Sequence, residues 1–214
     1  MSDMTGGRAD RANRLRNFLS GPCASSSQDY VRLTNLLFEQ SASYASATDG
    51  NCSVYALAGV PILFSALRAL LIECNYGMYG AGRNEERLEV LSKSANEILF
   101  LAKNYKIPIT LQQRLEILYE VRNEIIHPTH TPAGTSHGTP EYLVSLRVKG
   151  LLQSTNDEQS DYTWISQLQS HTLFGYAFAA LEDVASIVLS EHHASDESRC
   201  LHLASYSRYK LVRR

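Results

Sequence analysis

The segment from Thr110 to Pro128 constrains the fold of this chain most, because it predicts a single helix with a fixed end. A proline pushes its predecessor out of the α region, so residue 127 is the last one that can be helical. Placed at about 100° per residue, the apolar positions of the segment lie on one face. That apolar stripe consists of Leu111, Leu115, Leu118 and Ile125.

Polar groups occupy this helix where a packed helix ordinarily carries apolar ones. Arg122 falls within the stripe, between the directions of Leu111 and Leu115. A guanidinium cannot be buried alone at tolerable cost, so Arg122 must line a cleft, bind an anion or face a partner. Asn123 follows directly, and His127 stands at the helix end. An imidazole exchanges protons near neutral pH because its unperturbed pKa is about 6.5.

Two readings of these residues remain open from their chemistry. At this composition an Arg followed by a His at such a spacing also arises by chance, and then Arg122 is structural and His127 merely ends the helix. In the other reading Arg122, Asn123 and His127 form a site, because one turn of helix offers a fixed cation, an amide and an acid–base group.

The hexapeptide Arg122-Asn-Glu-Ile-Ile-His127 resembles the signature of the HEPN superfamily, in which an Arg, often followed by a polar residue, precedes a His near a helix end. The resemblance extends as helical architecture over about residues 28–191. It implies an all-α fold, an up-and-down bundle of four to five core helices with short extra helices. Many HEPN proteins are dimeric, metal-independent endoribonucleases that act as toxins or antiviral effectors.

The catalytic residues expected from this resemblance are Arg122, Asn123 and His127. His127 would take the proton from a 2′-hydroxyl, and Arg122 would stabilise the charge on the phosphorane. Asn123 would orient the imidazole or hold a phosphate oxygen. The products would be 2′,3′-cyclic phosphate and 5′-hydroxyl ends. Neither a cofactor nor a metal is expected.

The expected partners are RNA, a second copy of the chain, and an antitoxin or other regulatory protein. Positions five apart lie about 140° apart around a helix, so one copy does not present Arg122 and His127 side by side. Two copies around a two-fold axis would pool them in one composite cleft. The alternative of a different class is a non-catalytic HEPN-like dimerisation module that binds a nucleotide or a protein, and a plain helical scaffold is a third.

The composition fits an ordinary globular chain. The 214 residues carry a formal net charge of −2, which argues against a protein that coats duplex nucleic acid through a broad basic face. The cysteines are scattered without a CxxC pair, so we expect buried thiols in a reducing compartment. The apolar window 54–72 predicts a buried helix rather than a membrane span, and the first twenty residues lack the apolar core of a signal peptide. A cytoplasmic location is expected.

The chain divides into a basic N-terminal leader (1–26), a helical domain (27–191) and a basic C-terminal tail (192–214). From Ser198 onward the tail carries basic residues interleaved with tyrosines and no acidic residue. This composition predicts either that the segment is solvated or that it contacts single-stranded RNA. The composition of the loop 128–140 predicts a lid or a substrate-contacting loop, and its histidines lack the further ligands of a zinc site.

The expected helices follow from apolar spacing and from turn residues. Thr110, with Gln113 three residues later, predicts a capping box for the central one. Residues 141–152 alternate like a strand, but a helix closed by Gly150 is favoured. The expected core face of the first helix is Tyr30, Leu33, Leu36, Leu37 and Tyr44, and that of the third includes Ile98, Leu99 and Ala102. The expected ranges are 27–47, 55 or 61 to 75, 84–105, 110–127, 141–152 and 164–190.

Overall fold

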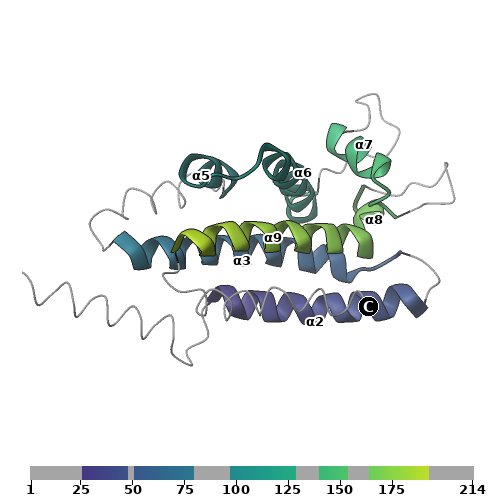
Figure 1. Cartoon of the computed structure of the whole chain (residues 1–214). Helices are drawn as coiled ribbons and strands as arrows, with labels where there is room; N and C mark the ends of the chain where they lie inside the picture. The colour runs from purple at the N-terminus through teal and green to yellow at the C-terminus, as the bar shows by residue number, and fades with distance from the viewer. Residues whose placement is uncertain (1–25, 48–50, 80–96, 129–139, 154–163, 193–214) are drawn as a thin grey trace, which may run out of the picture.

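A computed structural model describes residues 26–47, 51–79, 97–128, 140–153 and 164–192 (Figure 1). These residues form α-helices, and no strand occurs among them, so the all-α prediction is confirmed. The expected leader, the tail and the lid loop lie outside the described residues. The helices are α2 (Ser26–Ala47), α3 (Tyr55–Tyr79), α5 (Glu97–Asn104), α6 (Ile109–Ile126), α7 (Glu141–Val148), α8 (Trp164–Leu168) and α9 (His171–His192).

The two most apolar helices, α3 and α9, pack against each other at the centre of the fold. α2 covers one side of this pair, and α5, α6 and α7 lie on the other side (Figure 1). α3 contacts α2, α6, α8 and α9, and α6 also contacts α9. The core is therefore continuous across three layers, and its largest fully buried side chains are Phe100, Phe174, Phe178, Leu67, Leu70, Leu71, Leu101, Leu118, Leu143 and Leu146.

Gly59 allows α3 and α9 to approach each other closely. A Cβ built at Gly59 would lie 2.0 Å from Cζ of Phe174, and that ring has no exposed surface. Real Cβ atoms do not approach a ring this closely, so a hydrogen is the only substituent that fits here. The phenylalanine of α9 thus packs directly on the backbone of α3.

A short polar junction joins the start of α3 to the start of α9. Cys52 and Ser170 form an isolated antiparallel β-bridge, in which the N–H of Ser53 donates to the carbonyl of Gln169 at 2.9 Å. The hydroxyl of Ser170 caps α9 by accepting the N–H of Leu173 at 3.2 Å. Because of this bridge, the long final helix expected over 164–190 is divided into α8 and α9.

Two other helix boundaries differ from the sequence predictions. α6 begins at Ile109 with Pro108 at its N-cap and without a side-chain cap, so the capping box of Thr110 and Gln113 is wrong. The carbonyl of Pro108 already accepts the N–H of Leu111 at 3.0 Å, which starts the helix one residue earlier. α3 continues to Tyr79 and so extends beyond its expected end at residue 75. α7 is helical and is followed by Gly150 at φ 64°, as expected.

The predicted core face of α2 is wrong, and its true core face is rotated away from the most apolar stripe. Tyr30, Leu33, Leu36 and Tyr44 are 40–60% exposed. The buried positions of α2 include polar ones, because Ser41 donates to Ser53 at 2.6 Å and Thr34 donates to the carbonyl of Tyr30. In α5, Leu99 and Ala102 are likewise exposed. The core face of α2 consists of Ser27, Val31, Thr34, Phe38, Ser41 and Ala45.

Among the residues that the structure describes, two helices are long and apolar enough to cross a membrane by length and composition alone. They are the windows Tyr55–Cys74 of α3 and His171–Glu191 of α9, of which 50% and 61% are buried inside the fold. These are also the two helices at the centre of the bundle, and core helices of this kind pass the same test.

We expect Gly59→Ala to lower the free energy of unfolding by about 1–3 kcal/mol, because the added methyl group overpacks the contact with Phe174. Urea unfolding followed by circular dichroism measures this. Ser65→Ala on the exposed side of the same helix is the matched control, with an expected change of at most about 0.5 kcal/mol. An unchanged unfolding midpoint in Gly59→Ala would show that the two helices are not in such close contact.

Burial, and then the negative charge of Glu73, raises the pKa of the Cys74 thiol to about 12. We expect iodoacetamide to alkylate Cys74 at least about tenfold more slowly in the folded chain than in the urea-unfolded chain at mildly alkaline pH. Since the folded pKa is the higher one, this group leaves stability unchanged below pH 9 and lowers it as pH rises toward 12. Mass spectrometry of the alkylated peptide measures the rate, and equal rates would contradict the burial.

Candidate functional site

The candidate site lies on α6, which is held against α3 and α9 by its apolar face. Leu111, Leu115, Leu118 and Val121 of α6 are buried, and Ile125 packs against them while half-buried. The ring of Tyr119 meets the ring of Phe64 of α3 edge-on, with 5.9 Å between centroids. These contacts fix the side of α6 that faces the core, and Arg122, which the sequence placed within the apolar stripe, is half-buried.

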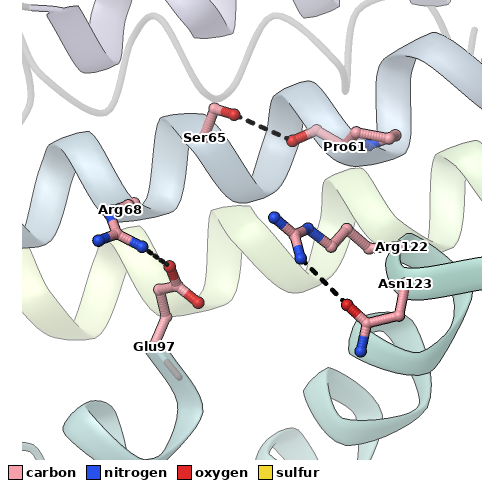
Figure 2. A network of polar contacts seen from close by, with 6 residues as sticks. All are labelled: Pro61, Ser65, Arg68, Glu97, Arg122 and Asn123. Carbon is pink, nitrogen blue, oxygen red and sulfur yellow. Dashed lines mark hydrogen bonds and ion pairs between the residues drawn. The ribbon is translucent and has the colours of Figure 1, made fainter. Parts of the chain in front are cut away.

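Arg122 has neutral neighbours. Its Nη1 donates to Oδ1 of Asn123 at 3.0 Å, and its guanidinium carbon lies 5.8 Å from the centroid of the Tyr119 ring. Within the described residues no carboxylate forms an ion pair with it. Figure 2 shows the side chain leaving α6 toward α3. Its positive charge is therefore only partly solvated and is not cancelled by an ion pair among these ranges.

The carboxylates of α6 lie on the other side of the helix. Glu120 and Glu124 stand two residues before and after Arg122, about 160–200° away around the helix axis. Their charges influence Tyr142 of α7. Burial raises the pKa of the Tyr142 hydroxyl, and the negative charges of Glu124 and Glu120 raise it further. α6 thus presents its negative side to α7 and its positive side to α3.

His127 ends α6 and is exposed. Its backbone, at φ −128° and ψ 68°, has left the helical region, and its N–H donates to the carbonyl of Asn123 at 2.7 Å. In the described part of the chain its imidazole makes no hydrogen bond or ion pair with Arg122 or Asn123. A single chain therefore brings Arg122 and Asn123 together and leaves His127 apart, at the solvent end of the same helix.

A second arginine faces the same region from α3. Nη1 of Arg68 lies 3.2 Å from Oε1 of Glu97, whose side chain is 7% exposed. In the view of Figure 2, Arg68, Glu97 and Arg122 lie on the same side of α3. The pair ties α5 to α3, so the charge of Arg68 is balanced while that of Arg122 is not balanced within the described ranges.

Sequence reasoning missed Tyr119 and the Arg68–Glu97 pair as neighbours of the candidate site. Tyr119 could have been found from the sequence, because residues three apart lie side by side on a helix and an aromatic ring beside a guanidinium is a favourable pair. The Arg68–Glu97 pair could not have been found from the sequence, since the two positions are 29 residues apart and meet only through the packing of α5 on α3.

A polar cluster at the opposite side of the fold was also missed. The Oγ of Ser41 lies 2.6 Å from Oγ of Ser53 and 2.8 Å from Nδ1 of His171. The His171 ring stacks on Phe38 with 4.6 Å between centroids. Both serines have no exposed surface, so no substrate reaches their hydroxyls. Asn51 binds Ser170 and Thr172 beside this cluster, which therefore holds α2, the start of α3 and α9 together.

Metal ligands are not gathered within the described ranges: no three His, Cys, Asp or Glu residues lie close enough to hold an ion there. The two loop histidines of the sequence lie outside these ranges.

Comparison of the chain with protein-family models, with curated proteins and with solved structures gave no match. The structure itself shows an all-α fold with a half-buried arginine on α6.

Replacing Arg68 by Met keeps the packed stem and leaves Glu97 buried without its guanidinium. We expect the free energy of unfolding to fall by about 1–3 kcal/mol, and the addition of Glu97→Gln to recover most of the loss. Urea unfolding measures both. Arg32→Met is the matched control, because its ion pair with Asp29 is exposed on both sides and contributes at most about 1 kcal/mol. A loss in the control as large as in Arg68→Met would refute the role of this pair.

Proposed function

We propose that this protein is a metal-independent endoribonuclease of the HEPN type, and that its catalytic residues are Arg122, Asn123 and His127. The observation that supports the proposal best is the guanidinium of Arg122, half-buried between an amide oxygen and an aromatic ring, with no ion pair among the described residues. A phosphate group would give this cation the anion that those residues do not supply. The hexapeptide beginning at Arg122 resembles the HEPN signature, which supports the same chemistry.

The roles follow from the residue types and from their places on α6. His127 is exposed, so its imidazole can reach a 2′-hydroxyl and act as the general base. Arg122 binds the non-bridging phosphate oxygens and stabilises the charge that develops on the phosphorane. Asn123, which accepts from Arg122 through Oδ1, fixes the direction of the guanidinium. Attack of the 2′-oxygen on phosphorus breaks the bond to the 5′-oxygen of the next nucleotide, which takes a proton from water and leaves as a 5′-hydroxyl, and a 2′,3′-cyclic phosphate remains.

A second copy of the chain completes the proposed cleft. Arg122 points toward α3, whereas His127 lies at the solvent end of α6, so the base and the phosphate contact are not adjacent in one chain. Packing two α6 ends around a two-fold axis would place the His127 of each copy near the Arg122 of the other. The proposed setting is the cytoplasm, where such an enzyme would act as a toxin or antiviral effector under the control of a regulatory partner.

A non-catalytic HEPN-like dimerisation module is the second candidate function. The observation that favours it is the separation of His127 from Arg122 in a single chain, because a nucleotide phosphate can bind Arg122 without any base nearby. In this case the same cation serves as an anchor for a nucleotide or a protein partner.

We expect the wild-type chain to cut single-stranded RNA in the presence of EDTA, and Arg122→Ala and His127→Ala each to reduce the rate about 10²-fold or more. Gel analysis of labelled RNA measures the rate, and the product ends identify the 2′,3′-cyclic phosphate. Arg32→Ala and Lys149→Ala, which remove exposed cations elsewhere, are the matched controls and should retain the activity. An equimolar mixture of the two inactive variants, refolded together, should regain part of the activity if the cleft is composite.

Other results would decide against the nuclease. Cleavage that persists at the same rate in both variants would place the activity elsewhere. Intact RNA together with nucleotide binding that Arg122→Ala abolishes would support the dimerisation module instead. If the chain neither cuts RNA nor binds a nucleotide, the remaining interpretation is a plain helical scaffold.

A further inference from the structure

The outer face of α2 carries an apolar stripe with a regular spacing. Tyr30, Leu33, Leu37, Gln40 and Tyr44 follow one another at intervals of three and four residues, the spacing of a helix seam that packs on another helix. Tyr30, Leu33 and Tyr44 are 40%, 45% and 42% exposed, and Leu37 is half-buried. Leu36 lies beside this seam and is 60% exposed. We call the surface formed by Tyr30, Leu33, Leu36, Leu37 and Tyr44 the α2 stripe.

The α2 stripe faces away from the candidate site. α2 lies on one side of the α3 and α9 pair, and α6 lies on the other (Figure 1). A second copy docked on α2 would therefore not bring two Arg122 side chains together. Whatever covers the stripe has a role separate from the proposed cleft.

The last turn of α9 lies near the first turn of α2. Phe38, in the second half of α2, contacts His171, Phe174 and Phe178 in the first turns of α9. The two helices run in opposite directions, so α9 ends near the start of α2, as Figure 1 also shows. Residues 193–200 span up to about 28 Å when extended, which exceeds the 8–10 Å between neighbouring helices.

We propose that residues 201–212 dock as a helix on the α2 stripe of the same chain, running parallel to α2. Placed on a helix, Leu201, Ala204, Tyr209 and Val212 fall within about 140° on one side. A helix of 12 residues is about 18 Å long, and the stripe from Tyr30 to Tyr44 is about 21 Å long. The tail and the stripe therefore match in length and in apolar character.

The charges of the tail fit the same arrangement. From Ser198 onward the tail has basic and no acidic residues, and α2 exposes Glu39 beside the stripe. With Leu201 beside Tyr30 in a parallel pair, Lys210 falls beside Glu39. The leader segment 9–19 also carries apolar residues, but the acidic Asp10 interrupts its basic charge. The tail is the better occupant.

Hydrogen exchange of the full-length protein, read by mass spectrometry, tests this docking. We expect the amides of residues 201–212 to exchange at least about tenfold more slowly than those of a free peptide of the same sequence. The double variant Leu33→Gln and Leu36→Gln, which changes only exposed side chains, should restore the peptide rate. The reciprocal variant Leu201→Gln and Tyr209→Gln should do the same. Val148→Gln on α7 removes an apolar side chain that is even more exposed, at 84%, and should leave the protection unchanged.

Several results would overturn the proposal. Exchange of the tail at the peptide rate in the wild-type protein would do so, as would protection that appears only after RNA is added. Protection confined to residues 9–19 and lost in the α2 double variant would identify the leader as the occupant. A concentration-dependent dimer in light scattering, dissociated by that double variant while the tail remains unprotected, would identify a second copy.

Discussion

The contact between Phe174 and the backbone of Gly59 sets the distance between the two central helices, and the other layers depend on it. With a hydrogen at position 59, α9 lies directly on α3, and their outer sides remain available to α2 and to α6. The polar junction of Ser41, Ser53 and His171 holds the same two helices at one end. α6 then packs across this rigid pair through its own apolar face, so the position of Arg122 follows from the packing of α3 and α9.

The half-burial of Arg122 has an electrostatic consequence. A charge at the border of the core loses part of its hydration, and a guanidinium tolerates this better than an ammonium because it is weakly hydrated. The Asn123 oxygen and the Tyr119 ring replace only part of the lost water. Glu120 and Glu124 are turned toward α7 and cannot replace the rest. An arriving anion therefore meets a cation that gains more from pairing than a fully solvated arginine would.

The sequence was sufficient to predict which segments are helical, because this depends on local spacing. The end of α6 at residue 127 followed from Pro128 alone, and the burial of Leu115 and Leu118 followed from periodicity. The core face of α2 could not be predicted in this way. Its buried face contains Ser41, whose burial depends on hydroxyl and imidazole partners 12 and 130 residues away. Periodicity detects apolar positions, so it selected the more hydrophobic and exposed stripe instead.

The resemblance to HEPN proteins suggests one homodimer both to cover the exposed apolar surface and to complete the proposed cleft. A homodimer can explain an exposed apolar surface, and it can complete a cleft, but in this fold those two features lie on opposite sides of the α3 and α9 layer. In the proposed dimer, a copy that supplies His127 to its partner must approach the end of α6, where Ile126 is 41% exposed and Pro128 is exposed as well. RNA bound between the two Arg122 side chains of the proposed dimer would add charge-assisted contacts at that interface, so the proposed substrate would itself stabilise the proposed dimer.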